Sequence, residues 1–183
     1  MTRISILLFF LVVCSATVMQ AQAQAPKAGP EVKKLHILVG HWTYEGEFKP
    51  GPLGPGGKVT GERTGEMILG GFFFQGRWTQ KGPEGEARAL EITGYDPVNK
   101  NYSSEFFFAD GSALSAVLTI SGNTLTWAGK GLGPGRQYLF KETFILAADL
   151  MSMTDKGEIS ADGKTWTPLF ERKHTKVPPA AKQ

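Results

Sequence analysis

Residues 38–48 read LVGHWTYEGEF, and the organisation of the chain follows from this stretch. Trp42, Tyr44 and Phe48 fall on one face of an extended chain, and mostly polar residues fall on the other face. A period of two is typical of a strand with one buried side. The sequence therefore predicts a strand whose aromatic face packs inward and whose His41 points outward.

Further segments with strand character follow, and each is bounded by turn residues. Asp110-Gly111 and Asp162-Gly163 are the sharpest hairpin signals. The predicted strands are 58–68, 72–80, 87–95, 101–109, 114–120, 123–128, 136–146, 150–157 and 166–174. With the first strand they make about ten short strands joined in order, which predicts an all-β, up-and-down antiparallel β-barrel.

A short helix is expected in front of the barrel, over residues 31–39. Pro30 suits its first turn, and Val32, Leu35 and Leu38 form one apolar stripe. The helix is too short to be stable alone, so we expect it to pack on the barrel as a plug or lid. The predicted domain is 31–176, with a linker at 26–30 and a disordered tail at 177–183.

The N-terminal residues predict export. Arg3 precedes an almost continuous apolar run, and Ala-Gln-Ala repeats at 21–25 place small residues at the spacing of a cleavage site. We interpret residues 1–25 as a signal peptide and expect a periplasmic or secreted protein with no stable membrane insertion after cleavage. A lipoprotein is the alternative, since Cys14 follows an apolar run, but a lipobox needs a small residue where Val13 stands.

Composition narrows the classes of partner and chemistry. Cys14 is the only cysteine, so the mature chain has neither a disulfide nor a thiolate ligand. Arg3 is the only charged residue before Lys27, so cleavage changes the formal charge from +3 to +2. Basic residues are scattered, and nucleic acid is therefore not an expected partner. The oligomeric state is left open by the sequence.

Several ordered motifs are shared with a known family. They are LVGHWTYEGEF, KPGPLGPGGKVTG, LGGFFFQGRW, ITGYDPVNKNY and ADGKTWTPLFERKHTK, which together span most of the mature chain. In these the chain resembles the bacterial domain of unknown function 1579 family (DUF1579), within the lipocalin-like superfamily. The resemblance implies a lipocalin-like barrel and no established activity. It also implies that Trp42 closes the barrel floor with Arg172 packed near it.

The Gly40-x-Trp42 opening is also similar to that of nitrobindin-like haem proteins, which use a late histidine as the haem ligand. Here that residue would be His174. Because His174 lies among Arg172, Lys173 and Lys176 before Pro178, we expect a frayed end there rather than a haem site. No cofactor is expected, and haem remains the alternative.

Strand parity places many aromatic residues on the inner face of the barrel. The inward set on the last strand is Trp166, Phe170, Arg172 and His174, whereas Phe73 is expected to face outward. Two interpretations stay open: a filled core, or a cavity that binds a small apolar molecule. The candidate ligand-binding residues are Trp42, Tyr44, Phe74, Trp78, Phe106, Tyr138, Phe140, Glu142 and Arg172.

Glu142 is the most informative of these residues, because it alternates with Phe140 and Phe144 on the inner face. A buried carboxylate is costly unless it is paired. We predict that Glu142 lies inside the barrel and pairs with an arginine, foremost Arg172. Such a partner would lower the pKa of Glu142. The functional interpretation is a polar anchor for a ligand, and the alternative is a purely structural pair.

Catalysis and metal binding find little support in the sequence. No serine stands in a Gly-x-Ser-x-Gly elbow, and the three histidines, His36, His41 and His174, do not have ligand spacing. The sequence therefore does not point to an enzyme. It favours a ligand-binding barrel, with a haem protein and a filled barrel that serves as an envelope interaction module as alternatives.

The first prediction concerns export. We expect the exported protein to begin near Gln24 or Pro26, because the paired Ala-Gln-Ala sites follow an apolar run. N-terminal sequencing of the protein recovered from the envelope or medium tests this. A mature chain that retains a lipid-modified Cys14 would show a lipoprotein instead.

Overall fold

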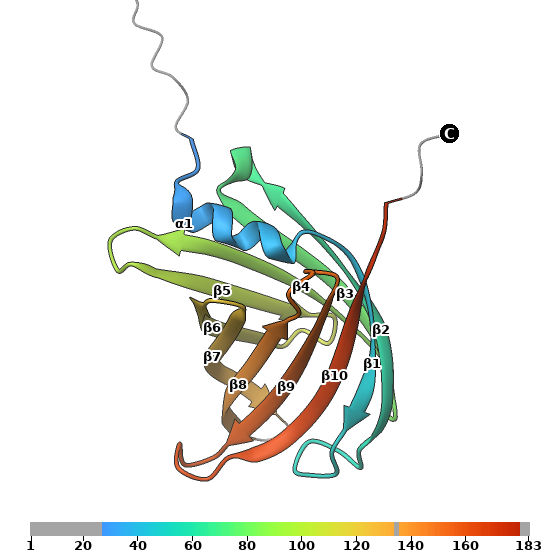
Figure 1. The fold of residues 1–183 in the computed structure, drawn as a ribbon. Coiled ribbons are helices and arrows are strands. Elements are labelled where there is room, and N and C mark those ends of the chain that lie inside the picture. The colour runs from blue at the N-terminus through green and yellow to red at the C-terminus, as the bar shows by residue number, and fades with distance from the viewer. Residues whose placement is uncertain (1–26, 134–135, 180–183) are drawn as a thin grey trace, which may run out of the picture.

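Ten antiparallel strands close into one barrel in the computed structural model of the protein, which describes residues 27–133 and 136–179 (Figure 1). Each strand pairs with the next along the chain, and the last pairs with the first, which confirms the predicted up-and-down barrel. The strands are β1 (Gly40–Phe48), β2 (Gly57–Ile68), β3 (Phe73–Gly82), β4 (Gly85–Asp96), β5 (Asn101–Phe108), β6 (Ala113–Ser121), β7 (Thr124–Gly133), β8 (Arg136–Leu146), β9 (Ser152–Ser160) and β10 (Thr167–Val177).

Several strands extend beyond their predicted ends, and two of these extensions change how the chain is divided into strands, loops and tail. β7 continues through glycines that look like a loop in the sequence. At Gly129 a Cβ atom would lie 2.1 Å from the Ser115 carbonyl oxygen, so the close approach of β6 requires glycine there. β10 runs on to Val177, which belongs to the barrel and not to the predicted tail. The predicted signal peptide, residues 1–25, lies outside the described residues.

The predicted N-terminal helix is present, and it tightens after one turn. α1 (Pro30–Lys33) continues as the 3-10 helix η1 (Lys34–Leu38), and together they lie across one end of the barrel (Figure 1). Leu35 and Leu38 are completely buried in the core. The Tyr102 hydroxyl contacts the carbonyl oxygen and a carboxylate oxygen of Glu31, each at 2.9 Å. This segment therefore closes the barrel at that end.

Trp42 lies in the apolar core beneath this helical segment. Its side chain is completely buried, which confirms its predicted place at the closed end. The expectation that Arg172 packs near it is wrong. Strand pairing sets Lys176 opposite Trp42 and Arg172 opposite Gly46, so the cation over the indole ring is Lys176 Nζ, 5.1 Å from the ring centroid.

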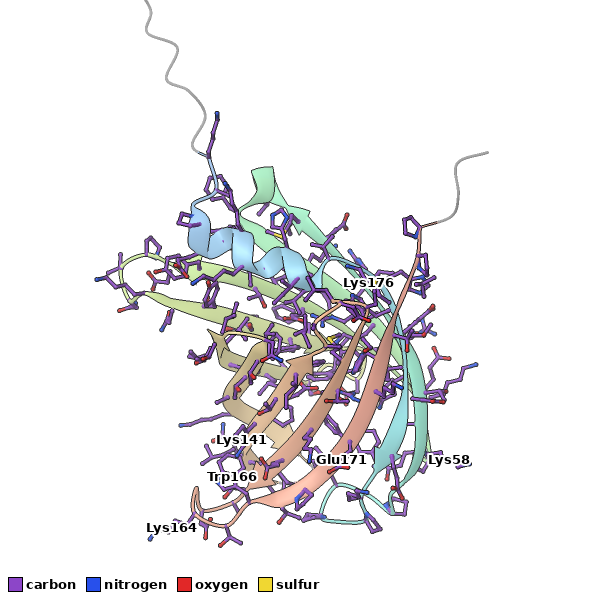
Figure 2. The ribbon with its side chains drawn as sticks, viewed as in Figure 1. Lys58, Lys141, Lys164, Trp166, Glu171 and Lys176 are labelled. Atoms are coloured by element: carbon purple, nitrogen blue, oxygen red, sulfur yellow. The ribbon has the colours of Figure 1, made fainter. Side chains whose placement is uncertain are left out.

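Strand parity is correct for most of the inner face and fails at the start of β10. The predicted inward position of Trp166 is wrong: Lys141 Nζ lies 4.5 Å from its ring centroid, and the two side chains neighbour each other in Figure 2. The cause is an irregularity in the register of β10 with β9 between Pro168 and Phe170. Phe73 is 39% exposed, as expected for an outward residue.

No helix among the described residues is long and apolar enough to span a membrane.

The fold predicts an unequal effect of two tryptophan truncations. Trp42→Ala removes a completely buried ring and should lower the free energy of unfolding by about 3–5 kcal/mol. Trp166→Ala, the matched control on the outer face, removes a half-buried ring and should cost less, about 1–2 kcal/mol. Guanidinium unfolding of both variants checks this, and an unchanged midpoint for Trp42→Ala would contradict the assignment of the closed end.

Candidate functional site

A cavity of about 330 Å³ occupies the part of the barrel away from α1. It reaches Leu53, in the loop between β1 and β2, and Asp110 and Ser112, in the turn between β5 and β6. Its walls are rich in aromatic rings, which are those of Tyr44, Phe48, Trp78, Phe106, Phe108, Trp127, Tyr138, Phe140, Phe144 and Phe170. The barrel is therefore packed at the end covered by the helix and hollow beyond it.

Most of the candidate residues from the sequence line this cavity. They are Tyr44, Trp78, Phe106, Tyr138, Phe140, Glu142 and Arg172. Trp42 and Phe74 do not line it, because they belong to the apolar core beneath η1 together with Leu35 and Leu38. The cavity is thus built from the inner faces of strands that are far apart in sequence.

Arg172 joins the charged groups on one side of the cavity. Its Nε donates to Asp155 Oδ2 at 3.0 Å, and its Nη1 donates to Gln80 Oε1 at 3.2 Å. Its Nη2 contacts Glu142 Oε1, which confirms the predicted pair inside the barrel. The guanidinium carbon lies 3.9 Å from the ring centroid of Phe170. One guanidinium therefore serves two carboxyl groups.

Sharing Arg172 changes the protonation of Glu142. Burial raises the pKa of Glu142 well above its usual value, and the neighbouring Asp155 carboxylate raises it further, although Arg172 acts in the opposite direction. Arg172 does act to lower this pKa, as expected, but the expected net lowering is wrong, because burial and the Asp155 carboxylate outweigh the arginine. For Asp155, burial opposes ionisation, but Arg172 and His174 outweigh it and lower the pKa. Of the two carboxyl groups that share Arg172, Glu142 therefore holds a proton more readily than Asp155.

His174 lies inside the barrel, and the expectation of a frayed end there is wrong. It is only 2% exposed, because β10 continues beyond it and pairs with both β1 and β9. Its ring makes tilted contacts with the rings of Tyr44 and Phe144, at centroid distances of 4.9 and 5.3 Å. Its Nε2 lies 3.3 Å from Asp155 Oδ2. Burial lowers the pKa of His174 and favours the neutral ring.

A second buried ion pair lies on β2 and β4. Arg63 Nη2 donates to Glu91 Oε2 at 2.8 Å, and both side chains are almost completely buried. Thr93 donates to the other oxygen of Glu91 at 2.8 Å. Its hydroxyl also lies 2.7 Å from that of Ser104, which accepts a hydrogen bond from Trp127 Nε1 at 3.0 Å. This network links four strands at the level where the apolar core meets the cavity.

Sequence reasoning does not identify Arg63, Glu91 or Asp155 as parts of this site. One signal was present for Arg63: it lies between Gly61 and Gly65, where a Cβ would strike Tyr44 or Phe74 at 2.4 and 2.6 Å. Such glycines mark a crowded inner face. For Glu91 parity misleads, because its neighbours Leu90 and Ile92 make the opposite face look more apolar.

The arrangement suits the binding of a small molecule that has an apolar body and a polar group. Aromatic rings supply apolar walls, and a few polar groups, among them Arg63, Glu142 and Arg172, reach the same cavity. The Tyr44 hydroxyl is neutral, since burial raises its pKa to about 12, and it donates to the Thr79 carbonyl at 3.0 Å. Within the described residues, no group of three His, Cys, Asp or Glu side chains is arranged to hold a metal ion.

Comparison with known proteins agrees with this fold. The family described as "Protein of unknown function (DUF1579)" matches residues 27–176. The crystal structure of Rv2717c from M. tuberculosis superposes with a TM-score of 0.62 at 14% sequence identity, covering 83% of this chain and 100% of that chain. At this identity the similarity concerns the fold alone. No curated protein matches the chain.

The shared guanidinium predicts unequal effects of two substitutions. Arg172→Met leaves the Asp155 carboxylate buried without its main cation and should cost about 3–5 kcal/mol. Glu142→Gln replaces a neutral carboxyl by an amide of the same shape and should cost about 1 kcal/mol. The control Glu158→Gln breaks the partly exposed pair with Lys141, 2.8 Å long, and should cost under about 1 kcal/mol. Equal losses for Arg172→Met and Glu142→Gln in denaturant unfolding would mean that Glu142 is charged.

The raised pKa of Glu142 also predicts a pH dependence. The folded protein holds a proton that the unfolded chain releases above about pH 4.5. The stabilisation linked to that proton is present below this pH and is lost as the pH rises toward the folded pKa, by at most about 1.4 kcal/mol per pH unit. Glu142→Gln should lack this loss, so denaturant midpoints measured across the pH range should increasingly favour the variant. Parallel curves would contradict a protonated Glu142.

Proposed function

The chain belongs to the DUF1579 family, and we propose that this member is an exported barrel that binds a small, mainly apolar molecule in its cavity. The observation that carries the proposal is the aromatic lining of an internal space of about 330 Å³. Small-molecule sites typically occupy about 300–1,000 Å³ and combine apolar walls with a few placed polar groups. A purely structural interior would instead be filled with side chains.

Export is the second part of the proposal and rests on the sequence. The apolar run after Arg3 and the Ala-Gln-Ala repeats support a cleaved signal peptide. A mature chain without cysteine folds equally in oxidising and reducing compartments. A periplasmic or secreted location would let the barrel take up molecules from outside the cytoplasm.

Haem is the alternative ligand that one observation favours, since His174 is buried and lines the cavity. Two features weigh against it. His174 Nε2 faces Asp155 Oδ2 at 3.3 Å, and the ring is held between two aromatic rings. Both arginines of the cavity are already paired with carboxylates, so they are poorly placed to receive the acidic groups of haem. The residues present therefore do not fit haem well.

A filled barrel that acts as an interaction module was the other alternative. Its best sequence support was an exposed apolar patch around Phe73. The ring of Phe73 covers Gly94 on the neighbouring strand, where a Cβ atom would lie 2.5 Å from it. Phe73 thus packs against the sheet of its own barrel, which weakens the case for a partner surface there.

A variant that fills the cavity tests the proposal. Gly131 lines the cavity, and a Cβ atom there would meet only Leu114 at an ordinary 3.6 Å, so Gly131→Trp should direct an indole into the space. The wild type should bind the neutral fluorescent probe N-phenyl-1-naphthylamine saturably at one site, and Gly131→Trp should weaken binding at least about tenfold.

The control for this experiment is Val117→Trp, which adds the same ring to the exposed face of the neighbouring strand β6. It should leave probe binding unchanged, and circular dichroism should confirm that both variants fold. Equal probe binding by Gly131→Trp would show that the probe binds outside the cavity. Haemin titration tests the alternative, because a stoichiometric Soret shift lost in His174→Ala would favour haem.

A further inference from the structure

The charges inside the barrel do not balance when all of its carboxyl groups are ionised. Among the described residues, the buried acidic groups are Glu91, Glu142 and Asp155, and the buried guanidinium groups are those of Arg63 and Arg172. Apart from tyrosines, the other buried titratable group among the described residues is His174, whose burial favours the neutral ring. The interior thus has three carboxyl groups and two permanent positive charges.

In the protein without a ligand, a proton on Glu142 removes this imbalance of charge. Arg63 is matched to Glu91, and Arg172 lies between Asp155 and Glu142. Holding Glu142 neutral leaves one carboxylate for each guanidinium, which avoids an uncompensated buried charge. Glu142 lines the cavity, so a positive group placed there could take over the role of its proton.

A second observation identifies what kind of group is missing. His174 lines the cavity, and its side chain is 97% buried, yet within the described part of the chain neither Nδ1 nor Nε2 makes a hydrogen bond. Of the two nitrogens, Nε2 lies 3.3 Å from the acceptor Asp155 Oδ2, which favours the tautomer with its hydrogen on Nε2. Nδ1 is then an acceptor that lacks a donor. Buried acceptors of this kind are costly unless something donates to them.

The walls beside this acceptor attract positive charge. The rings of Tyr44 and Phe144 flank His174, and the ring of Trp127 packs edge-on against Phe144 at a centroid distance of 5.2 Å. The faces of aromatic rings stabilise cations, most strongly where water is excluded. The protein already uses this attraction, since the Arg172 guanidinium lies 3.9 Å from the Phe170 centroid and 5.1 Å from that of Tyr44.

We propose that the cavity takes a small organic ammonium ion, whose positive charge balances the third carboxyl group of the interior. The inference rests on the proposed ligand-binding function and names the class of ligand. On binding, Glu142 releases its proton to solvent. The ammonium group then donates N–H bonds to the Glu142 carboxylate and to His174 Nδ1, while its apolar body lies against the aromatic walls.

Other ligand charges fit the interior less well. An anion would meet two guanidinium groups that are already paired and would face Glu91 and Asp155. A neutral molecule would leave Glu142 protonated and would need to supply its own donor to His174. Arg63 Nε also has no partner within the described residues, so the same ligand could carry an oxygen acceptor on its far side.

The titratable groups that face Glu142 come from several strands around it. Its own strand carries Tyr138, and the groups on the other strands are Tyr44, Arg63, Glu91, Asp155, Arg172 and His174. Asp110 lies at the cavity mouth, where it bonds to Ser112 and remains exposed to solvent. Glu142 is the group among these whose proton a bound cation would displace.

Three probes with one apolar body test the proposal by calorimetry near neutral pH. They are 1-naphthylmethylammonium, the neutral 1-naphthalenemethanol and the anionic 1-naphthoate. The ammonium should bind at least about tenfold more tightly than the alcohol, and the naphthoate should bind most weakly. Titrations in buffers of different ionisation enthalpy should show about one proton released per ammonium bound and none for the alcohol.

Two further measurements identify Glu142 as the source of the proton. In the wild type, the affinity for the ammonium should rise about tenfold per pH unit while Glu142 is protonated, and the affinity for the alcohol should stay level. Glu142→Gln should abolish the proton release and bring the affinity ratio of ammonium to alcohol close to one. The control Glu158→Gln, on the outer face, should keep both the proton release and the preference for the ammonium over the alcohol. The pH series needs no variant, so it remains decisive if Glu142→Gln folds poorly.

The outcomes separate this inference from the function on which it rests. If the neutral probe N-phenyl-1-naphthylamine binds in the cavity but the alcohol or naphthoate matches the ammonium, the barrel binds ligands and the charge assignment is overturned. Ammonium binding without proton release also overturns it. If neither this probe nor any naphthyl compound binds, both the function and the inference fail.

Discussion

The pairing of β1 with β10 is the constraint on which the rest of the structure depends. It closes the sheet, and its register sets His174 opposite Tyr44 and Arg172 opposite Gly46. Closure turns the alternate side chains of both strands inward, where no water can satisfy them unless a cavity is present. The inward polar side chains of β10 must therefore pair with groups on other strands.

Glycines make room for the cluster that results. A Cβ atom on Gly157 would lie 2.3 Å from the ring of Phe170, and one on Gly46 would lie 2.8 Å from the Arg172 side chain. These two positions let the Phe170 ring and the Arg172 stem lie flat against the backbone of the neighbouring strands. The guanidinium then reaches Asp155 and Glu142 while it covers the Phe170 ring. The Arg172 guanidinium thus packs on the Phe170 ring and pairs with the buried carboxyl groups at the same place.

The interior is divided into two parts with different physical roles. Beneath the helical segment the core is apolar and closely packed around Trp42, Leu35 and Leu38, and it supplies the hydrophobic stabilisation of the barrel. Beyond the buried ion pairs the aromatic side chains no longer meet, and a cavity remains. Buried ion pairs seldom add net stability compared with apolar residues of similar size. The ion pairs lie between the apolar core and the cavity. A role in the binding site explains this position better than a role in stabilising the fold.

The sequence by itself determined the fold class, the closed end and one buried pair. Strand alternation and turn residues predict the barrel, and the inner position of Glu142 among aromatic residues predicts its pairing with Arg172. Those features depend on neighbours along the chain or on a face defined by parity. The tertiary structure alone decided that Lys176 covers Trp42, that Asp155 shares Arg172, and that β10 continues past His174 and encloses it. Each of these depends on the register between strands, and a shift of one residue would send every side chain to the opposite face. Whether the aromatic residues fill the barrel or line a cavity likewise depends on how rings from distant strands meet, which no local pattern contains.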